Sequence, residues 1–498
     1  MSKRTTGVLI VIFLIVLCTR LYLAYDMPYF SSDESYFHLR QIEHIHDTGR
    51  PIFDDDLSYS GRTHYFSPVF HYLIAFFTLF LPVAFAAKLI TSIFAASLVF
   101  FVYLIARKIT HDSFVSLFTA FLSGFVPIFF ADTITEINPM SIAIPLIFLL
   151  IYAFMNIKDQ RWLYCYLVLL VALALIHPIV LLFILGLFIY LAIVLIERLK
   201  LNREELEISL FSIFFVLWMY FIMYKRVLVF HGPAVIWQNI PAPILNTYFS
   251  QISIIQAIYN IGVLPFVLGL YVIYMFSFKK KNKNIYLIMS FAASAGLLLW
   301  LRLINLNIGL MFFGIVLVLL FSQWFKDFMI FVKQSRASNF LYIFIVLFFI
   351  GVLIFSVYPS VEMAESNKNK ITFSEIKALE WIKENTPEDA VIIATPREGN
   401  LINAISGRKN VIDTDFLLQA GAGQRFEDIE RIYHACLEIE VVEILDKYDA
   451  DFIYFSDKAK RLFEQEELKF IDECFEKVYD DEVQIYQRKE GCALRVIR

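Results

Sequence analysis

Eleven long apolar segments constrain the fold of this chain more than any other feature of its sequence. A helix needs about 20 mostly apolar residues to cross the hydrocarbon core of a bilayer. Segments of that kind lie at 7–25, 89–106, 114–131, 139–157, 162–176, 178–196, 208–224, 254–278, 285–301, 303–325 and 340–358. The composition agrees, because 59% of the 498 residues are hydrophobic and 18% are charged, against about 45–50% and about 25% in globular chains. These values exclude a soluble globule, a disordered tail and a DNA-binding module, and they predict a polytopic α-helical membrane protein of about 11 spans.

A further apolar stretch, 67–87, decides how the spans are oriented. Cytoplasmic loops of membrane proteins carry an excess of Lys and Arg. If 67–87 does not cross the membrane, most basic residues of the membrane part, including the run at 279–283, face the cytoplasm; if it does cross, that run lies outside. We therefore predict a juxtamembrane or re-entrant segment at 67–87, a cytoplasmic N-terminus and an extracytoplasmic tail. The alternative is a twelfth span with the tail inside.

The charged residues divide the chain into two domains. Residues 361–498 contain 19 Lys and Arg against 30 Asp and Glu, whereas residues 1–360 contain 24 against 17. We predict a transmembrane domain at 1–360, with a first external loop at 26–66, and a soluble extracytoplasmic domain at 361–498. In the second domain helical patterns alternate with short apolar, β-rich runs, which predicts a small α/β domain. The helical patterns lie at 374–383, 425–448 and 457–476, and the apolar runs at 391–394, 411–412, 452–455 and 483–486.

The spacing of the cysteines bears on whether the chain is a disulfide-rich or a zinc-binding protein. The five cysteines are scattered and form no C-x-x-C pair, which argues against a disulfide scaffold or a zinc module.

The acidic residues of the membrane domain gather in its outward loops. Eight of its 17 acids fall in 26–62, and in the predicted topology only Asp132 and Glu136 also face outward. The two clusters could therefore face one another at the membrane surface. In the first loop, Ser31 and Glu34 fit a capping box and Gly49 fits a helix stop, so we predict a helix at 32–46.

The first turn of this helix holds Asp33 and Glu34. The helix dipole favours an ionised carboxylate there, which suits a metal ligand, a cation-holding group or a modest base. The alternative is that Glu34 only caps the helix and Asp33 only complements its dipole.

Other outward residues suit an anionic lipid head group and a sugar. Lys225, Arg226 and Arg302 lie near the outer ends of spans, and Arg forms bidentate hydrogen bonds with phosphate. Aromatic residues crowd the first loop, as a sugar-stacking or interfacial surface requires. Simpler interpretations remain: Arg302 snorkels to the head groups, and Asp54–Asp56 and Asp413 with Asp415 form ordinary turns. The first-loop histidines lack the spacing of a helical metal motif, which favours polar loop residues.

The first loop resembles that of the GT-C glycosyltransferases. The resemblance rests on Asp33-Glu34, Tyr36-Phe37-His38-Leu39-Arg40 and Gly61-Arg-Thr-His-Tyr-Phe-Ser-Pro-Val-Phe-His-Tyr72. It is similar to archaeal relatives of the oligosaccharyltransferase catalytic subunit, whose spacing matches Glu34, and to protein O-mannosyltransferases, whose pattern matches Asp33. Asp132 and Glu136 fall where the family has its second acidic motif. The family's Trp-Trp-Asp-Tyr-Gly motif is absent, which favours transfer of a monosaccharide or small glycan.

The resemblance implies a plasma-membrane enzyme that takes a sugar from a polyprenyl- or dolichyl-phosphate donor and attacks it from the outer face. It implies that Asp33 takes the acceptor proton, or that Asp33 or Glu34 joins Asp132 and Glu136 in holding a divalent metal, Mg or Mn. It implies a substrate-binding set of Arg302, Lys225, Arg226, Tyr36, His38, Arg40 and His64. The acceptor is a glycan, a protein or a lipid, and no nucleic acid is involved.

Three other functions stay open. The first is oligosaccharyltransferase-like transfer to protein. The second is a polytopic transporter or flippase, although carriers usually bury ionisable residues at mid-membrane and these spans contain almost none. The third is a non-catalytic glycan-assembly subunit.

Overall fold

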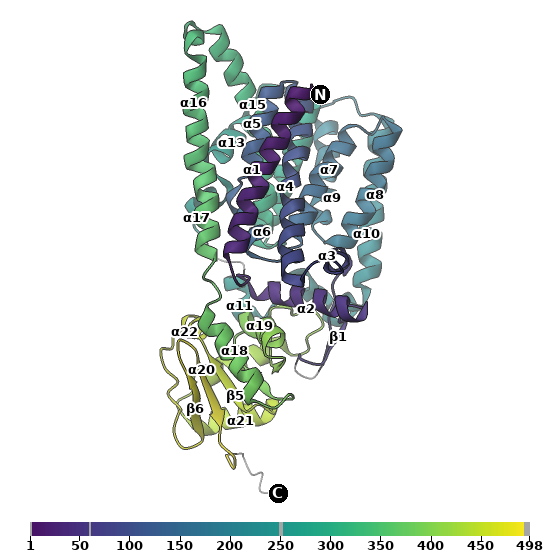
Figure 1. Ribbon diagram of the computed structural model, residues 1–498. Helices are drawn as coiled ribbons and strands as arrows, with labels where there is room; N and C mark the ends of the chain where they lie inside the picture. The colour runs from purple at the N-terminus through teal and green to yellow at the C-terminus, as the bar shows by residue number, and fades with distance from the viewer. Residues whose placement is uncertain (1, 59–60, 249–251, 493–498) are drawn as a thin grey trace.

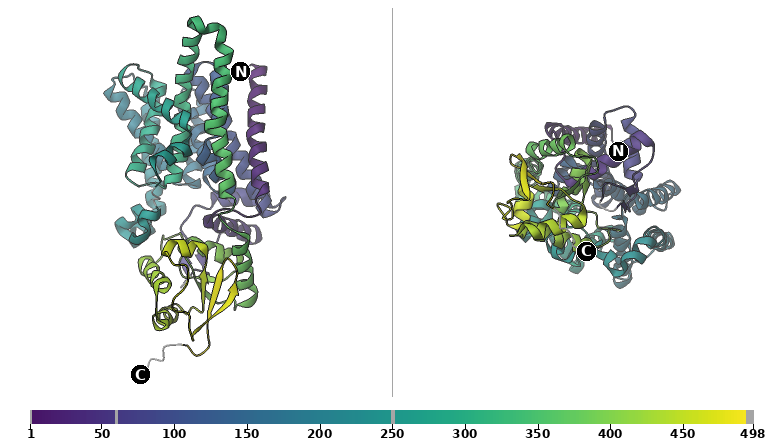
Figure 2. Two further views of the ribbon diagram at one scale, coloured as in Figure 1. Left: turned by 90° about the vertical axis from the view of Figure 1, so that its left-hand side faces the viewer. Right: turned by 90° about the horizontal axis from the view of Figure 1, so that it is seen from below.

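A bundle of long helices with a smaller sheet domain at one end makes up the protein (Figure 1). The computed structural model describes residues 2–58, 61–248 and 252–492. The N-terminus lies at the far end of the bundle from the sheet domain, and a view from the side shows the same separation (Figure 2). The predicted order, a helical membrane domain followed by an α/β domain, is therefore confirmed.

The bundle helices follow the eleven predicted apolar segments. They are α1 (Lys3–Asp26), α4 (Val83–Thr110), α5 (Ser113–Ser123), α6 (Pro127–Thr135), α7 (Met140–Met155), α8 (Gln160–Ile176), α9 (Val180–Ile196), α10 (Arg203–His231), α12 (Ile254–Ile261), α13 (Val263–Phe278), α14 (Lys283–Trp300), α15 (Leu306–Gln334) and α16 (Leu341–Val352), which continues through η3 (Leu353–Val357) into α17 (Tyr358–Asn367). Within the described ranges, six helices are long and apolar enough to cross a membrane, or up to eight if each bent pair is one span.

The doubtful stretch at 67–87 forms no continuous helix. It contains α3 (Val69–Thr78), and the chain breaks before α4 begins at Val83. A helix of ten residues is only about 15 Å long, half of the roughly 30 Å of a hydrocarbon core. The stretch cannot cross as one helix, which agrees with a juxtamembrane segment.

Two bent helix pairs shape the end of the bundle that faces the sheet domain. α5 and α6 meet at 47°, and α12 and α13 at 96°. The first break precedes Pro127, which has no N–H to continue the helix. The second falls at Gly262, whose φ of 99° suits a residue without a Cβ atom. The first bend sets α6, which carries Asp132, at the end of the bundle.

The first loop covers this end of the bundle. α2 (Asp33–Thr48) lies across it, between the bundle and the sheet domain (Figure 1). A short hairpin follows, in which β1 (Asp54–Asp55) pairs with β2 (Arg62–Thr63). At the same end, α10 leads into η1 (Gly232–Trp237) and α11 (Ala242–Tyr248).

The C-terminal domain is a five-stranded mixed sheet in the order β4-β3-β5-β7-β6, with helices beside it. Strands β4, β3 and β5 are parallel, and β7 is antiparallel to β5 and β6. Its elements are α18 (Phe373–Asn385), β3 (Val391–Ile393), η4 (Pro396–Glu398), α19 (Gly399–Ile405), β4 (Lys409–Asn410), α20 (Ala422–His434), α21 (Glu438–Tyr448), β5 (Phe452–Phe455), α22 (Asp457–Phe463), β6 (Phe475–Asp480) and β7 (Gln484–Arg488). A short connection, η2 (Arg336–Phe340), joins α15 to α16 in the bundle.

Three details of this domain differ from the sequence prediction. β4 ends before the predicted run at 411–412. α22 ends at Phe463, where Glu464 takes the left-handed conformation with φ of 52°. The mixed polar sequence of β6 gave no strand signal. A disulfide joins Cys474 to Cys492, although cysteine spacing alone had not indicated one.

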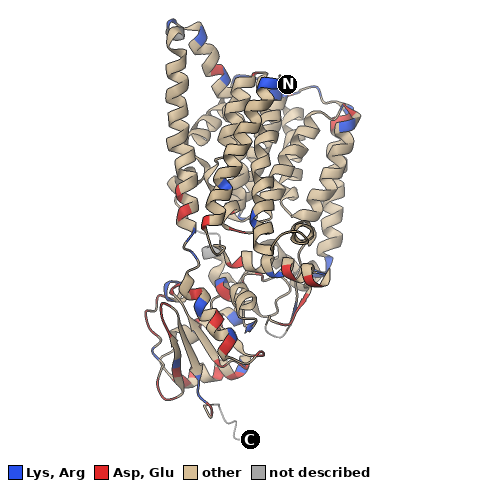
Figure 3. Ribbon diagram, in the orientation of Figure 1, with Lys and Arg blue, Asp and Glu red and all other residues tan. Residues whose placement is uncertain are grey.

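Charged residues avoid the middle of the bundle (Figure 3). They gather at its two ends and over the sheet domain, as expected where apolar side chains face lipid. The acids of the first loop and of the turn after α6 lie at the end of the bundle that meets the C-terminal domain.

Candidate functional site

The start of α2 is fixed against the turn between α6 and α7. The N–H of Ser31 donates a hydrogen bond to the carbonyl oxygen of Thr135 at 2.9 Å. The N–H of Ile137 donates to Oγ of Ser35 at 3.0 Å. These bonds place the first acidic cluster of the sequence beside the second.

The predicted capping box of α2 is wrong in its residues. Ser32, not Ser31, caps the helix, because Ser31 is held by the neighbouring turn and Oγ of Ser32 accepts from the N–H of Ser35. The helix ends at Gly49 in the left-handed conformation, with φ of 75°, as predicted. Because Ser32 provides the cap, the side chain of Glu34 is not used to cap the helix.

Asp33 is bound by the C-terminal domain. Its Oδ1 accepts from the N–H of Leu401 and its Oδ2 from Nδ2 of Asn400, both at 2.8 Å. The side chain is buried. Burial raises the pKa of Asp33 to about 7, although the bonds from Leu401 and Asn400 act in the opposite direction.

Glu34 has the opposite environment. Its side chain is 74% exposed, and its Oε1 lies 3.9 Å from Nε2 of His38. The surrounding protein and the nearby Asp415 carboxylate raise the pKa of Glu34. Of the two adjacent acids, Glu34 is the one that a substrate can reach.

Asp132 and Glu136 complete the acidic cluster. Asp132 is buried and accepts hydrogen bonds from Nδ2 of Asn307 at 3.0 Å and from Nδ2 of Asn367 at 3.4 Å. Burial, together with the Asp132 and Glu34 carboxylates, raises the pKa of Glu136 well above its usual range. The two predicted acidic clusters therefore lie close together, although no three His, Cys, Asp or Glu side chains in the described ranges are arranged to hold a metal ion.

Two residues of α2 itself, His38 and Tyr36, are buried against its neighbours. His38 and His71 share a hydrogen bond of 2.8 Å between Nδ1 and Nε2, and burial lowers the pKa of His38 to about 3. Tyr36 is buried and meets the edge of Phe30 with ring centroids 6.4 Å apart. His38 and Tyr36 were predicted to bind substrate. In the structure they hold α2, which carries Glu34, against its neighbours.

The acidic turn of the first loop is not solvated at its centre. Asp55 is buried and receives two hydrogen bonds from Arg40, at 2.9 and 2.6 Å. Its Oδ2 also lies 3.0 Å from Nε2 of His64, whose Nδ1 lies 3.1 Å from Oδ2 of Asp415 in the C-terminal domain. Arg40 and His64, predicted to bind substrate, thus form an ion-pair network.

Arg62 extends this network. Its guanidinium makes two hydrogen bonds to Asp413, at 3.0 and 2.8 Å, and a third to the carbonyl oxygen of Asp415. Asp413 and Asp415 therefore face the first loop, and the preferred interpretation of an ordinary turn is corrected.

The exposed cations lie around this region. Lys225 and Arg226 line an apolar groove of about 750 Å³ on α10, which also contains Ile222, Met223, Val229 and Phe230. The ring of Tyr224, next to Lys225, lies 5.0 Å from that of Tyr65 in the first loop. Arg302 is exposed in the turn between α14 and α15, five residues before the Asn307 that binds Asp132.

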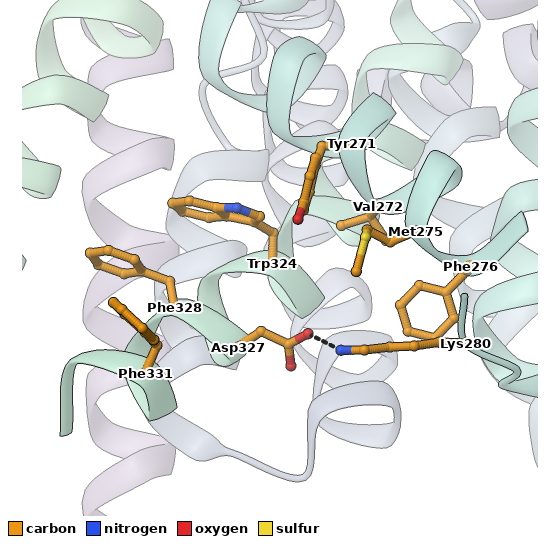
Figure 4. Close-up of a pocket in the computed structure, with 9 residues that line it drawn as sticks. All are labelled: Tyr271, Val272, Met275, Phe276, Lys280, Trp324, Asp327, Phe328 and Phe331. Atoms are coloured by element: carbon orange, nitrogen blue, oxygen red, sulfur yellow. Dashed lines mark hydrogen bonds and ion pairs between the residues drawn. The ribbon is translucent and has the colours of Figure 1, made fainter. Parts of the chain in front are cut away.

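A second cavity, of about 330 Å³, lies between α13 and α15 near the basic end of the bundle. Figure 4 shows Tyr271 and Trp324 in its wall and the 2.8 Å ion pair of Lys280 with Asp327 at one side. None of the predicted site residues lines it.

The fold is shared with the GT-C glycosyltransferases, as the resemblance implied. No protein-family model and no curated protein matches the sequence. The likeness is therefore one of three-dimensional structure.

Two of the similar structures come from Archaeoglobus fulgidus. Its oligosaccharyltransferase in the apo form has a TM-score of 0.69 at 14% identity, over 92% of this chain and 70% of that one. The same organism's oligosaccharyltransferase AglB, in complex with an inhibitory peptide and a dolichol-phosphate, has a TM-score of 0.63 at 16% identity, over 91% and 69%. Another structure of the enzyme contains Zn and sulfate.

A bacterial structure is similar over the whole chain. ArnT from Cupriavidus metallidurans bound to undecaprenyl phosphate has a TM-score of 0.52 at 11% identity, over 99% of both chains.

Proposed function

We propose that this protein is a membrane glycosyltransferase that moves a sugar from a polyprenyl- or dolichyl-phosphate donor to an acceptor. The exposed Glu34 carries the proposal, because it lies in an acidic cluster at one end of a lipid-facing bundle. The segments that carry Lys225, Arg226 and Arg302 contact the first loop or Asp132 at the same end. The shared fold supports it, since structures of that fold contain dolichol-phosphate and undecaprenyl phosphate.

In the proposed reaction, an acceptor hydroxyl attacks the anomeric carbon of the sugar. Glu34 takes the hydroxyl proton, the new glycosidic bond forms, and the bond from the anomeric carbon to the phosphate oxygen breaks. The phosphate leaves with the electron pair, and Lys225, Arg226 and Arg302 stabilise its charge.

Asp33, next to the proposed base Glu34, has a supporting role in the proposed reaction. Both of its oxygens are bound by the C-terminal domain, so in this arrangement the proton passes to Glu34. Asp33 contributes by holding the start of α2, and with it Glu34, in position.

The metal that the resemblance implies, Mg or Mn, does not fit the described arrangement. Asp33 and Asp132 already accept hydrogen bonds from amide groups, and the described acids, histidines and cysteines form no metal-binding group of three. The proposed reaction therefore has no step through a metal.

We propose that the reaction occurs outside the cell membrane, with the N-terminus in the cytoplasm. In the basic run at 279–283, Lys281 pairs with Glu197 and Lys283 with Glu205, beside the start of α10 and away from the C-terminal domain, as the positive-inside rule expects of a cytoplasmic face. The disulfide between Cys474 and Cys492 supports an oxidising, extracytoplasmic environment for the tail.

The test compares glycans of a deletion strain complemented with variants of the protein. Mass spectrometry of both glycolipids and glycoproteins names the product that the deletion removes. Glu34→Gln is expected to leave that product missing at wild-type membrane abundance, because amide replacement removes a base worth about 10²–10⁴ in rate. Glu43→Gln, on an exposed part of α2, is the matched control and should restore it. A normal product in Glu34→Gln refutes the proposal.

A further inference from the structure

Six charged side chains lie at the boundary between the first loop and the C-terminal domain. We call them the docking cluster: Arg40, Asp55, Arg62, His64, Asp413 and Asp415. Three are carboxylates and two are always cations, so the cluster is neutral only when the sixth residue, His64, is protonated. A buried charge is stable only when paired and hydrogen-bonded.

Arg62 and Asp413 form a deeply buried pair within it. Their side chains are 2% and 0% exposed, and they are 351 residues apart in the sequence. The guanidinium meets both carboxylate oxygens, which is the strongest geometry for an ion pair. Removal of either partner leaves an uncompensated charge inside the protein, which is strongly destabilising.

Backbone contacts continue the same boundary. The N–H of Asn410, in the edge strand β4, donates to the carbonyl oxygen of Leu57 at 3.1 Å, and Ser58 forms a parallel bridge with Asn410. The first loop thus adds to the edge of the sheet. On the other side, the N–H of Leu418 donates to Nε2 of His231 at the end of α10, at 2.7 Å.

These contacts have a consequence for the start of α2. They hold the C-terminal domain where Asn400 and Leu401 reach both oxygens of Asp33. Glu34 follows Asp33 in the same helical turn, so its direction depends on that hold. Without the C-terminal domain, two buried contacts of the helix start would be lost.

We propose that the docking cluster is a set of positioning residues, which seat the C-terminal domain on the first loop and thereby orient Glu34. Its role in orienting Glu34 rests on the proposed function, whereas the seating of the domain does not. None of the six residues needs to touch substrate.

His64 makes the seating dependent on pH. It faces Asp55 and Arg62 from its own loop and Asp415 from the C-terminal domain, and Arg40 acts on it through Asp55. Burial alone would lower the pKa of His64, but the bonds to Asp415 and Asp55 raise it above its usual value. A raised pKa means that the stabilisation is fully present below the unfolded value of about 6.5 and is lost as pH rises through the folded pKa.

The test measures hydrogen exchange at the Leu401 amide, whose N–H binds Asp33. The full chain is held in lipid nanodiscs, and the peptide that contains Leu401 is followed by mass spectrometry. Arg62→Met and Asp413→Leu are each expected to raise its exchange rate at least about 100-fold, because each leaves one buried charge unpaired. The double variant, which removes both charges, should return to within about 10-fold of wild type.

Arg203→Met is the matched control, because Arg203 forms a highly exposed pair with Glu207 elsewhere on the bundle. It should leave the Leu401 amide unchanged. A pH series provides a second readout: after correction for intrinsic exchange, wild type should lose protection above pH of about 6.5, and His64→Gln should lose less, because only the titration of Asp33, whose pKa is about 7, then acts on this amide.

Three results would overturn the proposal. If exchange at Leu401 is unchanged in both Arg62→Met and Asp413→Leu, the cluster does not seat the domain. If exchange rises only in peptides of the first loop, the cluster stabilises that loop alone. Full glycan product in a variant with an unseated domain removes the orienting role. If Glu34→Gln leaves the product normal while the single variants still expose Leu401, the proposed function fails and the seating of the domain stands.

Discussion

Asp33 offers the sharpest test of how the two domains share one site. Its two oxygens accept from the N–H of Leu401 and from Asn400. Asp33→Ala leaves the buried N–H of Leu401 without an acceptor, at about 1–3 kcal/mol, whereas Nδ2 of Asn400 keeps a hydrogen bond to Oγ1 of Thr414 at 3.3 Å. Both Asp33→Ala and Asp33→Asn remove the buried charge, but only Asp33→Asn keeps an oxygen that can accept from Leu401. We therefore expect the C-terminal domain to be seated about 1–3 kcal/mol less firmly in Asp33→Ala than in Asp33→Asn, with exchange at Leu401 at least about 5-fold faster.

Asp33→Asn has two opposing effects. One oxygen becomes an NH₂ group, which leaves one donor unpaired at about 1–3 kcal/mol. Against this, burial raises the pKa of Asp33 to about 7 from 3.8, so at pH of about 8 its ionised form costs on the order of 4 kcal/mol relative to an exposed aspartate. The neutral amide avoids that cost, and the seating should be as firm as in wild type or firmer.

The assay compares the two variants at one alkaline pH, by exchange at Leu401 and by glycan product. Equal exchange at Leu401 in Asp33→Asn and Asp33→Ala would refute the reasoning, because the acceptor oxygen that Asp33→Asn keeps would then contribute nothing. If the C-terminal domain stays seated in Asp33→Asn and the glycan product persists, Glu34 alone takes the acceptor proton. Product that disappears gives the charge of Asp33 a role of its own.

Two further predictions concern packing and covalent structure. A Cβ at Gly186 would lie 2.2 Å from the buried ring of Phe291, so Gly186→Ala should lower stability by about 1–3 kcal/mol; Gly296→Ala, with no atom within 4 Å, should be neutral or stabilising, and equal melting temperatures would contradict this. The Cys474–Cys492 disulfide spans 18 residues, so Cys474→Ser should cost the C-terminal domain about 3 kcal/mol in urea unfolding, and reductant should then have no further effect; an unchanged transition would count against the bond.

Fold class and most elements could be predicted because they depend on short windows of sequence. A span requires a local run of apolar residues, and the runs predicted at 7–25 and 303–325 form α1 and α15. The stop of α2 at Gly49 and the strand at Val391–Ile393 follow from equally local signals.

Two adjacent acids show what a short stretch of sequence cannot predict. Asp33 and Glu34 are adjacent and chemically alike, yet one is bound by the C-terminal domain and the other is exposed. Their grouping with Asp132 and Glu136 could be predicted, because all four follow from the topology of the spans. Their separate environments could not, since these depend on a contact between residues 368 positions apart.

The sequence by itself determined that this chain is a helical membrane protein with an acidic end and a small α/β domain. Only the tertiary structure decided that Asp55 and Asp413 are buried partners of arginines rather than solvated turns. The physical reason is that hydrophobic periodicity is written along the chain, whereas the burial of a charge depends on what packs against it from elsewhere.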